Sequence, residues 1–208
     1  NLVNEEITPW ESETITHDGA AREYVVINVP AVIKGKSALE LAIKETGLDP
    51  TRIVNMKVIG QLNPNDFSFM QSTSMLSLTN LNLEDVVLYD YDGNLSNKIP
   101  NTAFSNPDYN KLMRIILPKL TEIIGSSAFS RCTNIVYINI PEGVKEIEDY
   151  AFSGALSPNV TITLPSSLVA IGSAAFRDCR ATFKNFQLPS GLKKIYSGAF
   201  SGVKLDTE

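Results

Sequence analysis

The apolar residues in the second half of the chain recur at a nearly fixed spacing. The dipeptide Ala-Phe occurs five times, at intervals of 25, 23, 24 and 24 residues, with Ile four residues before each Ala. Pro stands ten residues before each of the last four Ala residues. The length of the repeat therefore varies only in the segment between Phe and the next Pro. Such a unit buries its apolar face only against copies of itself, which predicts a solenoid of stacked repeats. The five pairs begin at Ala103, Ala128, Ala151, Ala175 and Ala199.

Each regular repeat also contains a short segment of alternating apolar residues that ends at the Pro. The order is apolar-x-x-apolar-x-apolar-Pro, and a clear copy runs from Ile135 to Ile140. This alternation is typical of a half-buried strand, and Pro ends the strand because it has no N–H for the ladder. The pattern therefore predicts one strand per repeat, followed by a tight turn or helical segment. The copies are 112–117, 135–140, 159–164 and 183–188, with Asn159 in place of the first apolar residue in the third.

Two weaker copies precede the regular repeats. The apolar residues of segment 53–58 match those of segment 78–83 at a constant offset of 25, which places the start of the solenoid near residue 51. The 34 residues from Leu83 to Leu117 predict an insertion, centred on the turn-rich segment 89–98. We expect an N-terminal segment and cap over residues 1–50, irregular repeats over 51–111 and regular repeats over 112–208.

The N-terminal cap contains one clear helix signal. Ser37 and Glu40 have the spacing of a capping box, and Gly47 followed by Pro50 marks the end of a helix over 37–46. A phosphate-binding loop is the alternative interpretation, because the triplet 35–37 is Gly-Lys-Ser. Pro30 argues against it, since the loop requires Gly at that position and Pro has no N–H to contact phosphate.

One motif in the repeats connects the chain to a known family. From Leu164 to Cys179 the sequence follows L-P-x-x-L-x-x-I-x-x-x-A-F-x-x-C. This motif resembles the BspA-like leucine-rich-repeat family of bacterial surface proteins over residues 112–203, and segment 53–83 is similar to the irregular first repeats of that family. Leu120 departs from the motif by one position, and Ile124 is back in register.

The resemblance implies a fold, a location and a class of function. The fold is an α/β repeat solenoid: a leucine-rich-repeat stack with a parallel β-sheet on one face, short helices or turns on the other, and a helix-bearing N-terminal cap. The location is secreted or on the outer surface of a bacterium, with a lipid anchor. The function is adhesion or binding of host proteins, and no catalytic residue is implied, because fold alone does not determine chemistry.

The two cysteines occupy equivalent positions in repeats that are two apart. Cys132 and Cys179 each lie four residues after the repeat Ala, and Ala155 fills the same position between them. Stacked strands are about 4.8 Å apart, so two steps separate these Cα atoms by about 10 Å, beyond the roughly 7 Å limit for a disulfide. We therefore expect two free, buried thiols.

Other candidate chemistry has simpler explanations. Asp90, Asp92 and Asn94 place oxygen atoms at alternate positions, as in a calcium loop, but the bidentate Glu at the end of such a loop is missing. An ordinary Asp-Gly turn is expected there. His17 is the only histidine, and a Ser-His or Cys-His nucleophile would have to recruit it. We predict no cofactor, metal site or catalytic residue, and an enzyme with its site in the first 50 residues is the least favoured alternative.

Charge and hydropathy narrow the set of partners. The chain has 18 Lys and Arg against 23 Asp and Glu, a net charge of −5, and no clustered basic residues. Nucleic acid is therefore not an expected partner, because phosphate contacts depend on clustered Lys and Arg. No apolar run reaches the roughly 20 residues of a membrane-spanning helix, and the longest runs are the size of strands.

The outward positions of the predicted strands form the candidate binding site. Stacking aligns them into two columns of mostly neutral, hydrogen-bonding side chains, with Arg and Tyr in the middle, residue types that are enriched at interface hot spots. We predict that an extracellular protein or glycan binds this face. The alternatives are an ordinary solvated sheet face and a structural spacer or assembly element with homotypic contacts. The candidate residues are Asn80, Arg114, Tyr137, Thr161 and Asn185 in the first column and Asn139, Thr163 and Gln187 in the second, continued by Asn55, Lys57, Asn82 and Ile116.

The last predicted strand has no following strand to cover it. Each repeat Phe precedes the end of the next strand by 11 to 13 residues, so Phe200 predicts a strand that ends near position 212. Segment 183–188 is therefore expected to be the edge of the sheet. We expect the tail after Ser201 to fold back over this edge, or the edge to pair with another chain in edge-to-edge self-association.

Overall fold

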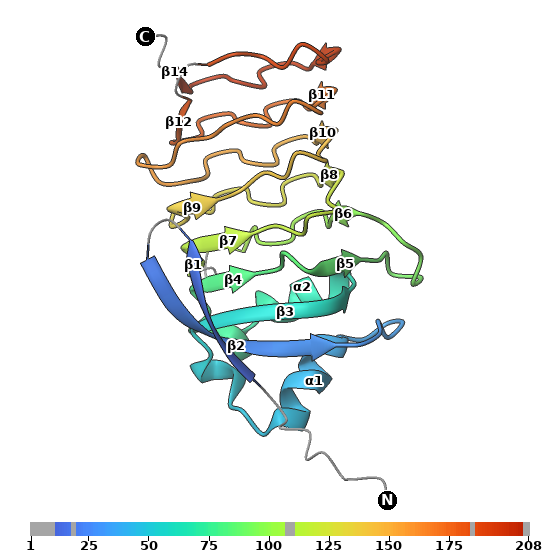
Figure 1. Cartoon of the computed structure of the whole chain (residues 1–208). Coiled ribbons are helices and arrows are strands. Elements are labelled where there is room, and N and C mark those ends of the chain that lie inside the picture. The colour runs from blue at the N-terminus through green and yellow to red at the C-terminus, as the bar shows by residue number, and fades with distance from the viewer. Residues whose placement is uncertain (1–10, 18–19, 107–110, 184–185, 206–208) are drawn as a thin grey trace, which may run out of the picture.

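The computed structural model describes residues 11–17, 20–106, 111–183 and 186–205 of the 208-residue chain. The described part is a stack of coils, with the N-terminal elements at one end and the C-terminal repeats at the other (Figure 1). Short parallel strands line two sides of this stack, and turns connect them. The solenoid predicted from the repeat spacing is confirmed.

One sheet covers the N-terminal and central part of the stack. Its outermost strands, β1 and β2, form an antiparallel pair, and every other pairing in this sheet is parallel. The sheet therefore extends across residue 50 into the N-terminal segment. The strand order is β1 (Glu11–His17), β2 (Ala20–Val29), β3 (Asn55–Leu62), β4 (Asn80–Asn82), β7 (Arg114–Ile116) and β9 (Tyr137–Ile138), and β5 (Val86–Leu88) also pairs with β3.

A second parallel ladder lines the side where helices or turns were expected. Each of its strands has two residues and contains the Ile that stands four residues before the repeat Ala. These Ile side chains are fully buried in the first four strands, which explains why that position is constant. In order, the strands are β6 (Lys98–Ile99), β8 (Ile123–Ile124), β10 (Glu146–Ile147), β11 (Ala170–Ile171) and β13 (Lys194–Ile195).

The turn around each Ala-Phe pair connects a repeat to the next one. Phe129 N donates to Ala151 O at 2.8 Å, and the same bond recurs from Phe104, Phe152 and Phe176. The residue before each Ala is in the left-handed region, and so is the second residue after every repeat Phe except Phe104. This conformation directs alternate N–H groups toward the next coil. These residues are Thr102, Ser127, Tyr150, Ala174 and Gly198 before Ala, and Arg131, Gly154, Asp178 and Gly202 after Phe.

The repeat Phe rings form a continuous column. Neighbouring rings are stacked with centroids 5.2 to 5.4 Å apart, from Phe104 to Phe200. The central rings are fully buried, and Phe200 at the end of the column is partly buried. Phe67 of the N-terminal part continues the column with an edge-on contact of 5.6 Å to Phe104. One apolar spine therefore joins the cap to the regular repeats.

Two short helices close the N-terminal part of the core. In α1 (Ala38–Thr46), Ser37 Oγ accepts from Glu40 N and Gly47 ends the helix in a left-handed conformation, as predicted. The second helix, α2 (Pro64–Met70), begins at Asn63 with a complete capping box. Asn63 and the buried Asp66 connect this helix to the segment before α1. Two single-turn 3-10 helices, η1 (Pro50–Arg52) and η2 (Thr73–Met75), complete this region.

The register of the irregular repeats is the predicted one. Asn55 pairs with Asn80, which confirms the offset of 25, and Asn80 pairs with Arg114 across the insertion. Within the insertion, β5 joins the main sheet, and a bridge between Tyr89 and Leu95 closes the predicted turn.

The predicted register is wrong between the last two strand segments. Thr161 was expected beside Asn185, but it pairs with Thr182, three residues earlier, and Asn185 lies outside the described residues. The exposed Asn159 cannot fill the first apolar position of its repeat, so Val160 is buried instead. Phe183 is also buried, with its ring edge-on to Phe176 at 5.3 Å. Packing of these two side chains favours the shifted pairing.

The tail covers part of the final edge. The strand β12 (Thr182–Phe183) pairs in parallel with β14 (Lys204–Leu205), so the expectation that the tail folds back is confirmed. Leu188 stays 45% exposed, because the pairing extends only over the first residues of the predicted edge.

Candidate binding face

The first column of predicted binding residues follows the pairing of the main sheet as far as Tyr137 in β9, where that sheet ends. Arg114 pairs directly with Tyr137, so the two side chains lie side by side on the outward face of neighbouring strands. Both side chains are partly buried. Further along the stack, Thr161, Thr163 and Gln187 are exposed.

The expectation that Asn80 is exposed is wrong. Only 6% of its surface is accessible, and its Nδ2 donates to Asn55 Oδ1 at 2.6 Å. Asn55 Nδ2 in turn donates to Glu23 O at 2.8 Å, so a chain of amides crosses three strands. Asn80 therefore supports the sheet, and the contact that buries it comes from residues distant in the sequence.

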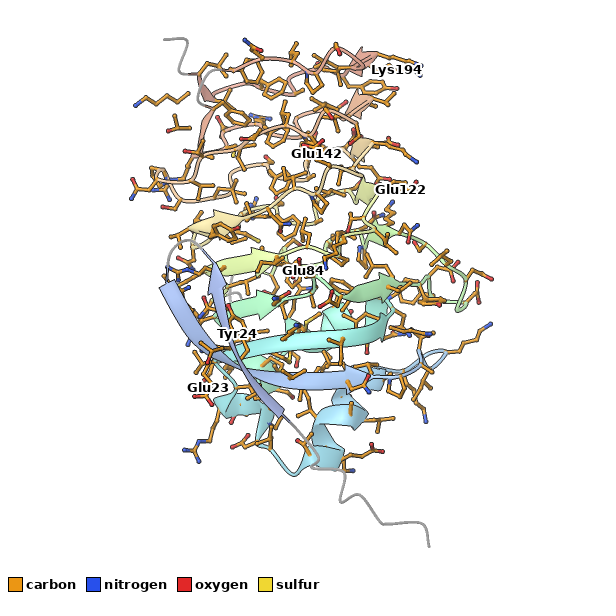
Figure 2. The ribbon with its side chains drawn as sticks, in the orientation of Figure 1. Glu23, Tyr24, Glu84, Glu122, Glu142 and Lys194 are labelled. Carbon is orange, nitrogen blue, oxygen red and sulfur yellow. The ribbon has the colours of Figure 1, made fainter. Side chains whose placement is uncertain are left out.

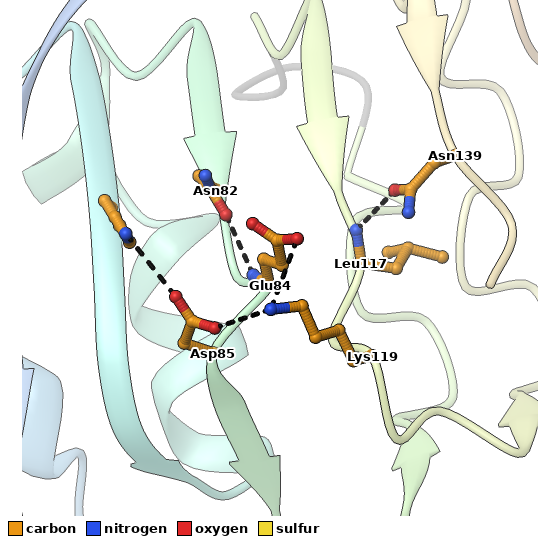
Figure 3. Close-up of polar contacts among 7 residues, drawn as sticks. Asn82, Glu84, Asp85, Leu117, Lys119 and Asn139 are labelled. Carbon is orange, nitrogen blue, oxygen red and sulfur yellow. Dashed lines mark hydrogen bonds and ion pairs between the residues drawn. The ribbon is translucent and has the colours of Figure 1, made fainter. Parts of the chain in front are cut away.

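Two further Asn residues hold turns in place instead of facing a ligand freely. Asn82 is buried, and its Oδ1 accepts from Glu84 N at 2.8 Å. Asn139 is partly buried, and its Oδ1 accepts from Leu117 N at 2.8 Å, which joins it to the preceding repeat (Figure 3). Both amides replace backbone contacts at the point where a strand ends.

A group of charged side chains borders the second column. Lys119 Nζ lies 3.0 Å from Asp85 Oδ1 and 3.4 Å from Glu84 Oε1, and Lys57 Nζ lies 3.4 Å from Asp85 Oδ2 (Figure 3). The hydrogen bond from Lys119 is the largest of the effects that lower the pKa of Asp85, and its charge and that of Lys57 add to them. These charges fix the edge of the face beside β4, and the exposure of Lys119 keeps the effect of its ion pairs on stability small.

The exposed end of the face contains a groove. Thr163 and Gln187 line a hollow of about 510 Å³ that opens beyond the bridge between Thr161 and Thr182. Its apolar lining comes from Ile162, Phe183, Phe186, Leu164 and Leu188, and its polar rim includes Glu142 and Ser166.

The rim of this groove is held by a contact between repeats. Ser166 donates to Glu142 Oε2 from both its N, at 2.9 Å, and its Oγ, at 2.8 Å. Figure 2 shows Glu142 in the C-terminal half of the stack. The groove therefore combines apolar and polar side chains, as protein interfaces do. The sequence placed Thr163 and Gln187 on this face but did not predict the groove, which lies beside the shifted pairing of Thr161 with Thr182.

A second hollow, near the N-terminal end, was not predicted. It has a volume of about 630 Å³ and lies between β2 and the loop that follows α1. Tyr24, Leu48 and Val54 supply apolar surface, and Asp49 and Arg52 supply charge. Figure 2 shows Glu23 and Tyr24 on this part of the molecule. The segment between Gly47 and Asn55 has no repeat pattern from which this hollow could have been inferred.

The side chains that were tested for chemistry have structural roles. Cys132 and Cys179 are free and buried, as predicted, and Cys132 Sγ donates to Phe104 O at 3.0 Å. Burial raises the pKa of the Cys179 thiol to about 11, which opposes thiolate formation. The side chain of His17 lies outside the described part of the structure. Within the described residues, no group of three or more His, Cys, Asp or Glu side chains could hold a metal ion.

The calcium-like segment forms a turn. Asp90 Oδ1 accepts from Asp92 N at 2.9 Å and from Asn94 N at 2.8 Å. The Asp92 carboxylate pairs with Lys34 at 2.8 Å, so both acids have protein partners. The predicted Asp-Gly turn is confirmed.

The comparison with known families identifies the repeat. Residues 97–207, just over half of the chain, match the family model described as the BspA type leucine-rich repeat region, in six copies. The chain belongs to the BspA-type leucine-rich-repeat family. This family is associated with bacterial surface proteins, and leucine-rich-repeat domains generally bind other proteins.

Two solved structures are similar to this BspA-type chain. A leucine-rich-repeat protein of Treponema pallidum is 30% identical over 59% of this chain and 69% of its own, with a TM-score of 0.38. A leucine-rich-repeat protein of Bacteroides ovatus is 16% identical over 91% of this chain and 70% of its own, with a TM-score of 0.39. No curated protein matches the sequence. In the described residues, both helices are too short to cross a membrane.

Proposed function

We propose that this BspA-type chain is a non-enzymatic binding module that recognises an extracellular protein or glycan through its sheet face. The observation that carries the proposal is the direct pairing of Arg114 with Tyr137 in the middle of that face. Arg and Tyr are over-represented among the residues that dominate binding energy, since each combines a large contact area with hydrogen-bonding groups.

The groove beside Thr163 and Gln187 extends the proposed binding surface. Its apolar side chains can receive an apolar side chain or a sugar ring, and the hydroxyl and amide groups of its rim can direct polar groups of the ligand. Asn80 has no place in this surface, because its side chain is buried. The proposed contact residues are therefore Arg114, Tyr137, Thr161, Thr163 and Gln187, whereas Asn139 supports the strand end through its bond to Leu117 N.

The proposed location follows the family. A secreted or surface-attached position, with a lipid anchor, would expose the sheet face to extracellular partners. Nucleic acid is not among the proposed partners, since the chain has a net charge of −5. A spacer with homotypic contacts is the second candidate function, favoured by exposed apolar side chains along the stack, such as Leu120 and Tyr150.

Binding can be tested with purified extracellular-matrix proteins and a glycan array as probes. The variant Tyr137→Ala should weaken any interaction of the sheet face about tenfold or more, as expected for an interface hot spot. Gln187→Ala tests the groove separately. Arg177→Ala is the matched control, because Arg177 is exposed on a repeat turn away from this face. Equal loss for Arg177→Ala, or binding that is unaffected by both face variants, would contradict the proposal.

A further inference from the structure

A third hollow lies between the two helices, and none of the proposed contact residues of the sheet face lines it. Its volume is about 560 Å³, which is within the range of small-molecule sites. The loop before α1, the two helices and η2 form its walls, in the part of the molecule where Figure 1 shows α1 and α2. The lining side chains that bear on its chemistry are Lys36, Glu40, Leu41, Asn65 and Phe69.

One buried amide group of this hollow has no hydrogen-bond partner. Asn65 belongs to α2, and its backbone N donates to Asn63 Oδ1 at 2.8 Å. The side-chain Nδ2 of Asn65 is shielded from solvent and donates to no group in the described part of the chain. A buried donor without an acceptor lowers stability, so such a group in a folded protein needs an explanation. A ligand in the hollow can supply the missing acceptor.

A cation and an anion of the same hollow are also available to a ligand. Ser37 Oγ accepts from Glu40 N at 3.0 Å, but the carboxylate of Glu40 does not complete the capping box. Among the described residues this carboxylate has no hydrogen bond or ion pair, and neither has the ammonium group of Lys36. Both side chains are exposed. The hollow therefore presents one positive and one negative charge that do not neutralise each other.

The N-terminus of α1 does not itself form an anion site. Asp66 Oδ1 accepts from Leu39 N at 2.9 Å and from Ser37 Oγ at 2.8 Å. Glu40 N is bonded to Ser37, so the N–H groups of the first turn that could bind a phosphate are occupied. A ligand with several negative charges is also opposed by the carboxylate of Glu40. The hollow therefore favours a ligand that carries one negative and one positive group.

The walls of the hollow are held in place without a ligand. Asn63 Nδ2 donates to Ile33 O at 3.0 Å and to Lys36 O at 3.4 Å, and these bonds join the loop before α1 to the start of α2. Apolar surface comes from Phe69 and from Leu41, which is 40% exposed. A ligand can cover this surface without ordering the loop, which lowers the entropic cost of binding.

We propose that this hollow binds the zwitterion of an α-amino acid with an apolar side chain. The carboxylate of the ligand accepts from the ammonium group of Lys36 and from Asn65 Nδ2, and the ammonium group of the ligand donates to Glu40. The apolar side chain of the ligand lies against Leu41 and Phe69. One ligand of this class supplies a partner to each of the three protein groups that lack one. The proposal does not depend on the ligand of the sheet face.

Three related ligands separate the contributions of the two charges. L-leucine carries both charges, L-leucinamide carries only the positive charge, and N-acetyl-L-leucine carries only the negative charge. For a ligand with the size of leucine we expect a Kd of about 1 to 10 mM. Leucinamide and N-acetyl-leucine should each bind about three- to tenfold more weakly, because each loses one ion contact. NMR titration of the full chain, followed at the side-chain amide signal of Asn65, measures all three Kd values.

Variants of the two charged residues should remove this discrimination selectively. Lys36→Gln should raise the Kd of leucine about three- to tenfold without weakening the binding of leucinamide. Glu40→Gln should raise the Kd of leucine by a similar factor without weakening the binding of N-acetyl-leucine. Lys44→Gln is the matched control, because Lys44 is exposed in the last turn of α1 and does not line the hollow. An equal loss of leucine binding in Lys44→Gln would overturn the proposal.

Asn65→Ala tests the buried amide, with binding followed at the backbone amide signals of α2. Leucine binding should weaken, while the stability of the chain without ligand should not fall, because the substitution removes an unsatisfied donor. A loss of stability would show that the amide has a partner within the fold and would contradict the proposal.

The ligand series itself can also overturn the proposal. Equal Kd values for the three ligands would mean that the hollow selects only the apolar side chain. Tighter binding of N-acetyl-leucine than of leucine would indicate an anion site instead. The same conclusion against a zwitterion site follows if the signal of Asn65 does not move at about 100 mM leucine, roughly ten times the weakest expected Kd.

Discussion

At the scale of single residues, the repeat turn holds residues other than Gly in the left-handed backbone conformation, which is unfavourable for any residue with a side chain. Two positions in every turn after the first are left-handed, and most of the left-handed residues of the turns are not Gly. A non-Gly residue in the left-handed region carries a strain of roughly 1 to 2 kcal/mol, which a substitution by Gly removes. Gly also has more freedom in the unfolded chain, and the loss of that freedom on folding cancels about half of the gain. The hydrogen bonds that the N–H groups of the turn donate to the next coil stabilise this left-handed conformation.

Substitution of Gly at an exposed left-handed position should stabilise the chain. Arg131 has φ 62° and is exposed, so Arg131→Gly removes strain and loses little packing. We expect an increase in the free energy of unfolding of about 0.5 to 1 kcal/mol, measured by urea denaturation. Thr133→Gly, at an exposed position nearby without positive φ, should instead lower it. A loss of stability in both variants would show that the turn is not strained.

The buried thiol of Cys179 predicts a dependence of stability on alkaline pH. Folding raises the pKa of Cys179 from 9.0 to about 11, so the neutral thiol stabilises the fold fully below about pH 9. This contribution is lost as the pH rises from about 9 through about 11, because only the unfolded chain ionises there. Urea denaturation at pH 8 and pH 11 should show a larger loss for the native chain than for Cys179→Ala. Equal losses would mean that other groups, such as Tyr and Lys, account for the effect.

At the scale of elements, the two helices depend on one buried carboxylate. Asp66 accepts from Ser37 Oγ at 2.8 Å, Leu39 N at 2.9 Å and Asn63 N at 2.8 Å. Burial raises the pKa of Asp66, which these hydrogen bonds partly oppose. The carboxylate therefore joins the start of α1 to the start of α2 and satisfies N–H groups that would otherwise be buried without partners.

Removal of this carboxylate should loosen both helices. Asp66→Ala leaves Leu39 N and Asn63 N unsatisfied, and we expect a loss of about 2 to 4 kcal/mol in the free energy of unfolding. Hydrogen exchange should accelerate first in α1, because Leu39 N joins α1 to Asp66 across 27 residues of sequence and one side of this helix is exposed to solvent. Asp92→Ala is the control, because its ion pair with Lys34 is exposed and should contribute little. Equal effects of the two substitutions would contradict the role of Asp66.

The elements also show which features a sequence pattern can predict. The offset between segments 53–58 and 78–83 predicted the pairing of Asn55 with Asn80, because packed coils must keep equivalent apolar residues in register. The two-residue strands of the second ladder were not predicted, since two residues are too few to show alternation. The burial of Asn80 was also missed, because it depends on an amide contact with a residue 25 positions away.

At the scale of the whole molecule, the register shift shows how a local exception changes a surface. Asn159 interrupts the apolar pattern, and Thr161 then pairs with Thr182. The groove beside Gln187 opens where the predicted pairing ends. The repeat spacing predicted the stack and its apolar spine, while the shape of the candidate site depends on side-chain packing at the residues that break the repeat.

The last prediction concerns how far a change at one end of the stack propagates. Each coil contacts only its neighbours, so loss of the final strand should destabilise the C-terminal coils and leave the cap intact. Deletion of residues 204–208 removes β14 and leaves β12 paired only with Thr161, whereas deletion of residues 206–208 keeps both strands. We expect hydrogen exchange to accelerate at Phe183 only in the longer deletion, with no change at Ile27 or Val58 in β2 and β3. Thr182 N donates to Val160 O of the preceding coil and is the internal comparison. Acceleration throughout the chain would show that the solenoid unfolds as a single cooperative unit, and acceleration in neither deletion would show that β14 does not protect the edge.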